Sequence, residues 1–372
     1  MMIRLAIVMV AASTVLVACV APATSPIASA TVQPSAPTTA NASAVAPTAQ
    51  PATSPAATAT DPAADPPSWN RLDVPGPSAR EDHTWTADPA GSTAYLFGGR
   101  DGATVHGDLW AYDLEADAWT ELAPADGPAP RFGHEAVWAD GVGLVVFAGQ
   151  AGPTFFNDLW AFDPQKMSWR VLPDDGAIPV SRYGTCAAIA PDGKLWISHG
   201  FTSDGTRFAD TRTYEFATGS WTNATPPSGL PVNRCLHGCW WTDAGELALF
   251  GGQTTGVTAL DDRWTLRDGA WTRVEGTQPT ARNLYARVRL SGAMLVVGGQ
   301  ANDGTFHADA WLLHDGVADA EPLEVTGDAP QARAGAEMVR DASGRILLFG
   351  GRDGAQAYAD TWEITGADDG SP

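Results

Sequence analysis

Six arginines recur along the chain at intervals of about 50 residues, and their guanidinium groups could bind a planar anionic or carbonyl ligand. Each is followed by a short apolar segment, then by a glycine pair or a variant of it, and then by Arg, Gln or Phe. The six arginines are Arg80, Arg131, Arg182, Arg234, Arg282 and Arg333. The residues that follow the glycine pairs are Arg100, Gln150, Phe201, Gln253, Gln300 and Arg352.

The segments after the glycine pairs also carry aromatic side chains, which offer stacking faces to a ligand. These residues are His106, Phe155, Phe156, Phe208, Phe306, His307 and Tyr358, together with the cation Arg207. Planar donors combined with aromatic faces suit the recognition of a carbohydrate or a peptide. We therefore predict a binding surface made of arginine, glutamine and phenylalanine side chains. Its residues are Arg80, Arg100, Arg131, Gln150, Phe155, Phe156, Arg182, Phe208, Arg234, Gln253, Arg282, Gln300, Phe306, Arg333 and Arg352.

An aspartate in every repeat provides a purely structural alternative for the six arginines. These aspartates are Asp108, Asp158, Asp210, Asp262, Asp309 and Asp360. An arginine paired with an aspartate in each repeat would tie the rim of the repeat together. A residue that recurs in all six repeats more often has a structural role than a functional one. Each non-repeating loop residue is therefore, taken individually, a better functional candidate.

Histidines and glutamates are the candidates for metal binding and for acid–base chemistry. His83, His134 and His237 each lie three residues after a repeat arginine, but Thr185, Tyr285 and Ala336 fill the matching positions elsewhere. We predict hydrogen-bonded core histidines, no metal and no cofactor. Glu81, Glu135 and Glu337 could supply an acid–base pair, so an enzyme acting on a carbohydrate, epimerase-like or oxidase-like, stays open as an alternative.

Three cysteines follow Cys19. Cys186 lies four residues after Arg182 and Cys239 five residues after Arg234, so their side chains have the opposite parity that facing strands require. Cys235 and Cys239 are four residues apart, about 13 Å in an extended strand, which is beyond disulfide reach. We predict a Cys186–Cys239 disulfide and a free Cys235.

Each repeat divides into four short segments that favour β-strands. In the first repeat these are residues 82–87, 93–97, 108–113 and 118–122. A turn signal rich in Asp and Gly separates the first two segments in every copy, and no segment of helical length has a 3.6-residue period. The pattern predicts one all-β domain over residues 68–366.

The repeated residues resemble the kelch motif. Phe97-Gly98-Gly99, Asp108-x-Trp110, Trp119 and Pro130-Arg131-x-x-His134 carry this resemblance. It implies a six-bladed β-propeller with four antiparallel strands per blade. The third copy departs most, because His199 replaces a glycine and Arg212 a tryptophan.

Strand polarity predicts which residues share one mouth of this ring and how the ring closes. The start of each first strand and the end of each second strand lie at the same edge of the ring, which we call the mouth, so the binding candidates gather there.

The sixth repeat ends after Ile364 without a fourth strand, whereas Ser68–Leu72 matches Ala118–Leu122. The N-terminal strand is therefore expected to complete the last blade and remove a free edge.

The first 67 residues are not expected to belong to the propeller. A basic start and a short apolar run end at Leu16-Val17-Ala18-Cys19, which resembles the lipobox of bacterial lipoproteins. It implies a signal peptide over residues 1–18 and a lipid on Cys19; an ordinary signal with a chance cysteine is the alternative. Residues 19–67 are rich in Ala, Pro, Thr and Ser and predict a disordered linker, and residues 367–372 a disordered tail.

Net charge narrows the choice of partners. The formal charge is -21, and Lys166 and Lys194 are the only lysines. This balance argues against nucleic acid and against electrostatic docking onto anionic lipid. We expect a monomeric, extracytoplasmic propeller that is lipid-anchored to a bacterial membrane and binds a protein, peptide or glycan. A purely structural envelope interaction protein is a further alternative.

Overall fold

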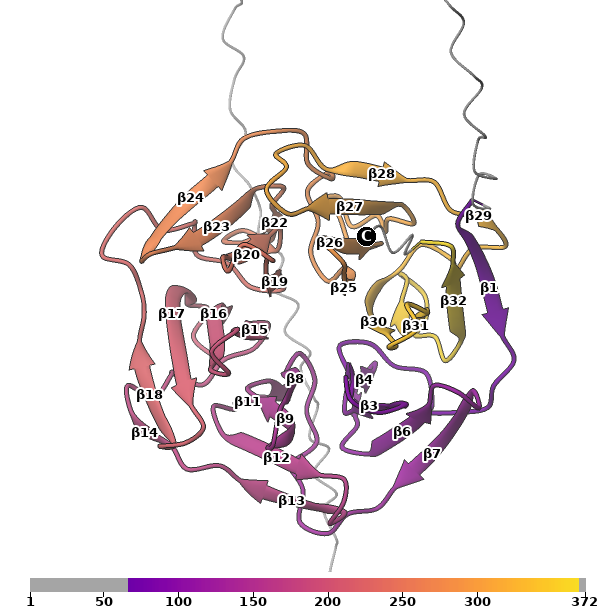
Figure 1. The fold of residues 1–372 in the computed structure, drawn as a ribbon, viewed down its shortest axis with the longest axis horizontal. Helices are drawn as coiled ribbons and strands as arrows, with labels where there is room; N and C mark the ends of the chain where they lie inside the picture. The colour runs from indigo at the N-terminus through magenta and orange to yellow at the C-terminus, as the bar shows by residue number, and fades with distance from the viewer. Residues whose placement is uncertain (1–65, 368–372) are drawn as a thin grey trace, which may run out of the picture. The chain divides into compact units, whose positions relative to one another are not determined.

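The structure, a computed structural model, describes residues 66–367, which form a ring of six β-sheets around a central axis (Figure 1). Every sheet has four strands, and two of the six carry a short fifth strand. The predicted all-β, six-bladed propeller with four antiparallel strands per blade is confirmed. No helix in this part of the chain is long and apolar enough to cross a membrane. The predicted signal peptide, Cys19 and linker, and nearly all of the C-terminal tail, lie outside the described residues.

The blades follow one another in chain order, and within each blade the strands are named from the axis outwards. Blade 1 comprises β2 (Thr84–Ala87), β3 (Thr93–Phe97), β6 (Leu109–Asp113) and β7 (Ala118–Leu122). Blade 2 comprises β8 (Glu135–Ala139), β9 (Gly143–Phe147), β12 (Leu159–Asp163) and β13 (Ser168–Val171). Blade 3 comprises β15 (Cys186–Ile189), β16 (Leu195–Phe201), β17 (Arg207–Glu215), β18 (Ser220–Asn223) and the short β14 (Asp175–Gly176).

The second half of the ring repeats this order. Blade 4 comprises β19 (Gly238–Trp241), β20 (Leu247–Phe250), β23 (Arg263–Arg267) and β24 (Ala270–Val274). Blade 5 comprises β25 (Ala286–Leu290), β26 (Ala293–Val297), β27 (Ala310–His314) and β28 (Glu321–Leu323). Blade 6 comprises β30 (Ala334–Arg340), β31 (Ile346–Arg352), β32 (Thr361–Thr365), β1 (Ser68–Leu72) and the short β29 (Thr326–Gly327).

Three two-stranded ribbons extend the loops that follow the glycine pairs. They are β4 (Arg100–Asp101) with β5 (Thr104–Val105), β10 (Gln150–Ala151) with β11 (Thr154–Phe155), and β21 (Gln253–Thr254) with β22 (Thr258–Ala259). Each ribbon is antiparallel and carries side chains predicted to bind a ligand.

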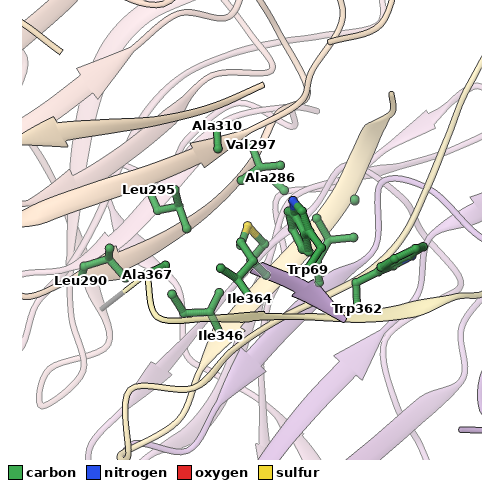
Figure 2. Close-up of a cluster of buried hydrophobic side chains, with 13 residues drawn as sticks. Trp69, Ala286, Leu290, Leu295, Val297, Ala310, Ile346, Trp362, Ile364 and Ala367 are labelled. Atoms are coloured by element: carbon green, nitrogen blue, oxygen red, sulfur yellow. The ribbon is translucent and has the colours of Figure 1, made fainter. Parts of the chain in front are cut away.

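The first and last strands of the propeller close the ring. Strand β1 pairs antiparallel with β32, from Ser68 opposite Thr365 to Leu72 opposite Thr361. Trp69 is 5% exposed and packs in the cluster between blades 5 and 6, near Trp362 and Ile364 (Figure 2). The N-terminal strand therefore completes the last blade, as the sequence predicted.

The glycine pairs allow neighbouring blades to approach each other closely. At Gly98, where φ is +66°, an added Cβ would lie 2.5 Å from the carbonyl oxygen of Arg131 in the next blade. The amide of Gly99 donates a hydrogen bond of 2.9 Å to that same oxygen. The equivalent bond recurs at every interface, including the one from Gly351 back to Arg80. Close backbone contact between blades thus favours glycine at these positions, although Ala148 and His199 take the place of Gly98 in blades 2 and 3 with a similar φ.

Candidate functional site

The six repeat arginines lie inside the blades and not on the mouth surface. The Arg80 guanidinium is fully buried and donates to both carboxylate oxygens of Asp108, at 2.7 and 2.8 Å, and to the carbonyl of Gly98 at 2.9 Å. Its Nε donates to the carbonyl of Ser78 at 3.0 Å. The same arrangement joins Arg131 to Asp158, Arg182 to Asp210, Arg234 to Asp262, Arg282 to Asp309 and Arg333 to Asp360.

These contacts correct the prediction that the six arginines bind the ligand. The N–H groups of each guanidinium are directed at a carboxylate and at backbone carbonyls. A ligand could bind the guanidinium only by disrupting these hydrogen bonds within the blade. Burial raises the pKa of Asp108, but the hydrogen bonds and charge of Arg80 outweigh burial and hold it below its usual range. The arginines therefore stabilise the blades, which is the structural role that the sequence offered as the alternative to ligand binding.

Two of the predicted phenylalanines belong to the same scaffold. The Phe156 ring covers the Arg131 guanidinium at 4.0 Å, and the Phe208 ring covers that of Arg182 at 4.4 Å. Tyr358 covers Arg333 in the same way at 4.1 Å. Each aromatic side chain is half-buried. Each ring makes a cation–π interaction that covers a blade ion pair, so Phe156 and Phe208 support the scaffold, and their predicted role in ligand binding stays a prediction.

The residues after the glycine pairs do gather at the mouth, around the axis. Arg100, Gln150, Phe201, Gln253, Gln300 and Arg352 are all half-buried. Their backbones pair with the residue that follows each repeat arginine, for example Arg100 with Glu81 and Gln300 with Asn283. The ring of blades thus brings together six side chains that are about 50 residues apart in the sequence.

Charged groups at the centre of the mouth form one network. Glu81 is 5% exposed; its carboxylate accepts a bond of 3.0 Å from Arg100 Nε and a second bond from Arg352 Nε. Asp82 accepts a hydrogen bond of 3.2 Å from the Tyr183 hydroxyl and lies 3.5 Å from Arg100 Nη2. Burial, opposed by the two arginines, raises the pKa of both carboxyl groups.

Aromatic rings surround these cations. Arg100 lies 4.3 Å from the Phe132 ring, Arg352 5.3 Å from Phe306, and Arg207 5.2 Å from Phe201. Phe155 contacts Phe201 edge-to-face. Arg207 donates to Gln253 at 3.2 Å and Arg352 to Gln300 at 3.3 Å. The mouth therefore combines three half-buried guanidinium groups with two buried carboxyl groups and several aromatic faces.

Asp82, Phe132 and Tyr183 are mouth residues that were absent from the predicted set. They occupy the first and second positions after the repeat arginine, where the six copies differ most. The variability of these positions among the six copies was the sequence signal that could have identified them as candidate site residues.

A ring of backbone hydrogen bonds encircles the axis just beyond the mouth. The amide of Gly133 donates to the carbonyl of Asp82 at 2.8 Å, and Gly184 to Gly133 at 2.9 Å. The ring continues through Leu236, Leu284 and Gly335 and returns to Asp82. All six residues have positive φ, and a Cβ at Gly133 would lie 1.9 Å from the Tyr183 ring. This ring therefore marks the boundary between the mouth residues and the later residues of the innermost strands.

The glutamates proposed as an acid–base pair lie on different sides of this ring. Glu81 is part of the mouth network, whereas Glu135 and Glu337 lie further along strands β8 and β30, beyond the ring. The three residues thus do not share one site.

The three equivalent histidines lie at three different blade interfaces. His83 packs edge-to-face against Phe349, His134 against Phe97, and His237 against His199. Burial lowers the pKa of His134 to about 3, so this imidazole is neutral. Within residues 66–367, no group of three His, Cys, Asp or Glu side chains is placed to hold a metal ion.

The structure joins Cys186 and Cys239, the predicted pair, in a disulfide between the innermost strands of blades 3 and 4. Their Cα atoms are 5.7 Å apart. Cys235 is a buried free thiol.

Comparison with known proteins places the repeats in a wider context. Residues 63–252, which are 190 of the 372 residues, match the family model described as the KLHDC2/KLHL20/DRC7 Kelch-repeats domain. A stretch of 180 residues is 31% identical to the tRNA wybutosine-synthesizing protein 4 of Emericella nidulans; it covers 44% of this chain and 17% of that protein.

Two further relatives share shorter stretches. The flagellar outer arm dynein alpha chain of Chlamydomonas reinhardtii is 29% identical over 154 residues, 37% of this chain and 3% of that protein. The tRNA wybutosine-synthesizing protein 4 of Aspergillus fumigatus is 31% identical over 134 residues, 34% of this chain and 12% of that protein. This chain spans less than a fifth of the length of any of the three.

Proposed function

Because this chain belongs to the kelch-repeat family, we propose that it is a binding protein whose mouth holds an anionic segment of a protein or peptide partner. The observation that carries this proposal is the group of three half-buried guanidiniums, Arg100, Arg207 and Arg352, set among aromatic rings. Half-buried guanidiniums bind carboxylates more strongly than exposed ones, because less water competes for their N–H groups.

The charge distribution supports an anionic ligand. The protein as a whole carries a formal charge of -21, yet the mouth holds three arginines and two carboxyl groups, of which Arg100 and Arg352 contact the carboxyl groups and Arg207 does not. The mouth thus holds more guanidinium groups than carboxyl groups in an otherwise acidic protein, and this balance favours an acidic ligand there.

Substituting the two outer guanidiniums tests this proposal. The double variant Arg207→Gln/Arg352→Gln is expected to weaken binding of an acidic peptide at least tenfold, because each lost charge-assisted hydrogen bond is worth about 1.5–3 kcal/mol. Isothermal titration with peptides selected from an array of acidic, neutral and basic sequences provides the measurement. Glu81 keeps Arg100 as a partner in this variant, so the melting temperature should change little.

Arg170→Gln is the matched control, since Arg170 is exposed on the outer strand of blade 2. Unchanged peptide affinity in the double variant would contradict the assignment of the mouth. Binding of neutral glycans in place of acidic peptides on parallel arrays would favour carbohydrate recognition. Turnover of a free sugar would favour the enzyme alternative.

We also propose that the protein acts outside the cytoplasm, tethered to a bacterial membrane by a lipid on Cys19. The Leu16–Cys19 sequence supports the tether, and the Cys186–Cys239 disulfide supports an oxidising compartment. Metabolic labelling with a radioactive fatty acid should mark the wild-type protein, and the label should be lost in Cys19→Ala. Cys235→Ala is the control and should keep the label. An unlabelled wild-type protein would overturn the tether and leave an ordinary secretory signal as the alternative.

A further inference from the structure

The innermost strands of the six blades surround a funnel on the face opposite the mouth. These strands start at the mouth and run away from it, and their later residues line a cavity of about 500 Å³. The ring of backbone hydrogen bonds lies at the end of the funnel nearest the mouth, where the six ring residues help to line a smaller cavity of about 50 Å³. The funnel has the volume of a small-molecule site.

Three charged side chains meet at the base of the funnel. Glu135 comes from blade 2, Arg287 from blade 5 and Glu337 from blade 6, and all three line both cavities. Arg287 Nη2 donates to Glu135 Oε2 at 2.9 Å. Glu337 has no hydrogen-bond partner among residues 66–367. One half-buried carboxyl group therefore remains without a hydrogen-bond partner at the base, and its ionised form would be stabilised there by a ligand cation.

The surroundings of Glu337 favour a proton when the funnel is empty. Burial raises the pKa of Glu337 to about 8 against the opposing charge of Arg287, and the charges of Glu135 and Asp82 contribute to the rise. Burial likewise raises the pKa of Glu135 to about 7, opposed by Arg287. A ligand cation at Glu337 would replace the proton.

The outer wall carries the remaining charges of the funnel. Arg289 and Arg340 lie there. Arg289 is paired with Asp243 at 2.7 Å and with Asp315 at 2.5 Å. The carboxyl group of Glu337, at the base, is the group in the funnel that a ligand cation would meet.

The walls between base and rim are largely apolar and aromatic. Trp138 and Trp241 are half-buried in the wall, and Val288, Met338 and Val339 contribute aliphatic surface. Such a wall stabilises the apolar body of a ligand by excluding water, and indole faces also attract cations.

From this arrangement we propose that the funnel is a second ligand site, which binds a small organic amine with its ammonium group on Glu337 and its apolar body against the tryptophan-lined wall. This site uses none of the three mouth arginines, so the proposal does not rest on the binding proposed there.

Phenethylamine and its neutral isostere 2-phenylethanol test the proposal on the full chain by isothermal titration calorimetry. At pH 8.5 the amine should bind at least tenfold more tightly than the alcohol, because Glu337 is then largely ionised. Between pH 8.5 and 6.5 the affinity for the amine should fall by about 20-fold, since a proton competes for the carboxylate. At pH 6.5, titrations in two buffers with different ionisation enthalpies should show release of about one proton per amine bound.

Glu337→Gln keeps the side-chain shape and removes the charge. It should abolish the preference for the amine, leave the affinity for the alcohol unchanged and fold with a melting temperature at or above that of the wild type. Glu115→Gln, in an exposed turn of blade 1, should behave as the wild type. Equal affinity for amine and alcohol, absence of binding at millimolar ligand, or an amine preference that persists in Glu337→Gln would each overturn the proposal. If the Glu337→Gln variant fails to fold, the pH dependence of amine binding and the proton release of the wild-type protein test the proposal without it.

Discussion

Replacing Arg234 with methionine is expected to destabilise the protein by about 3–5 kcal/mol, the usual cost of removing one partner of a buried ion pair. Arg234 is fully buried and donates to Asp262 at 2.6 and 2.7 Å, to the carbonyl of Gly251 at 2.9 Å and to that of Val232 at 3.0 Å. Methionine has a similar length and removes all four hydrogen bonds, so Asp262 is left with the indole N–H of Trp264. Urea unfolding followed by circular dichroism measures the loss.

Arg273→Met provides the control for this variant. Arg273 lies in the outer strand of the same blade and its side chain is 52% exposed, so its loss should cost less than about 1 kcal/mol. A double variant that also replaces Asp262 with leucine should recover part of the loss, because the unpaired carboxylate is gone. If Arg234→Met kept its stability and lost only ligand binding, the arginine would be a site residue and not part of the scaffold.

Deleting residues 68–73 is expected to abolish cooperative unfolding of the propeller or to lower its melting temperature severely. Strand β1 supplies the outer strand of blade 6, and its loss exposes the edge of β32 and removes Trp69 from the cluster between blades 5 and 6. Removing the Trp69 side chain alone, in Trp69→Ala, should cost about 3–5 kcal/mol. Differential scanning calorimetry compares the three proteins.

A deletion of residues 50–55 in the Ala- and Pro-rich segment is the matched control for chain length and should leave the transition unchanged. An undisturbed cooperative transition after deletion of residues 68–73 would show that the ring does not depend on β1 for closure.

The scaffold was more accessible to sequence reasoning than the site. Arginine, the glycine pair, aspartate and tryptophan recur because every blade has the same contacts to make, so repetition itself identified the blades and the closing strand. The same logic favoured a structural role for the six arginines, and the ion pairs to Asp108 and its counterparts bear this out. The contacts of Phe156 with Arg131 and of Phe208 with Arg182 were not anticipated, because each ring and its arginine lie on different segments of the blade.

Local periodicity and strand parity were enough to establish the number of blades, their strand order, the closing role of Ser68–Leu72 and the Cys186–Cys239 pair. Which side chains meet on the axis depends instead on the assembled ring. Glu81 meets Arg352, and Glu135 meets Arg287, across separations of 271 and 152 residues. Such contacts require the curvature of the closed ring and the positive-φ backbone ring that divides the axis into a mouth and a funnel, and no repeat contains either feature on its own.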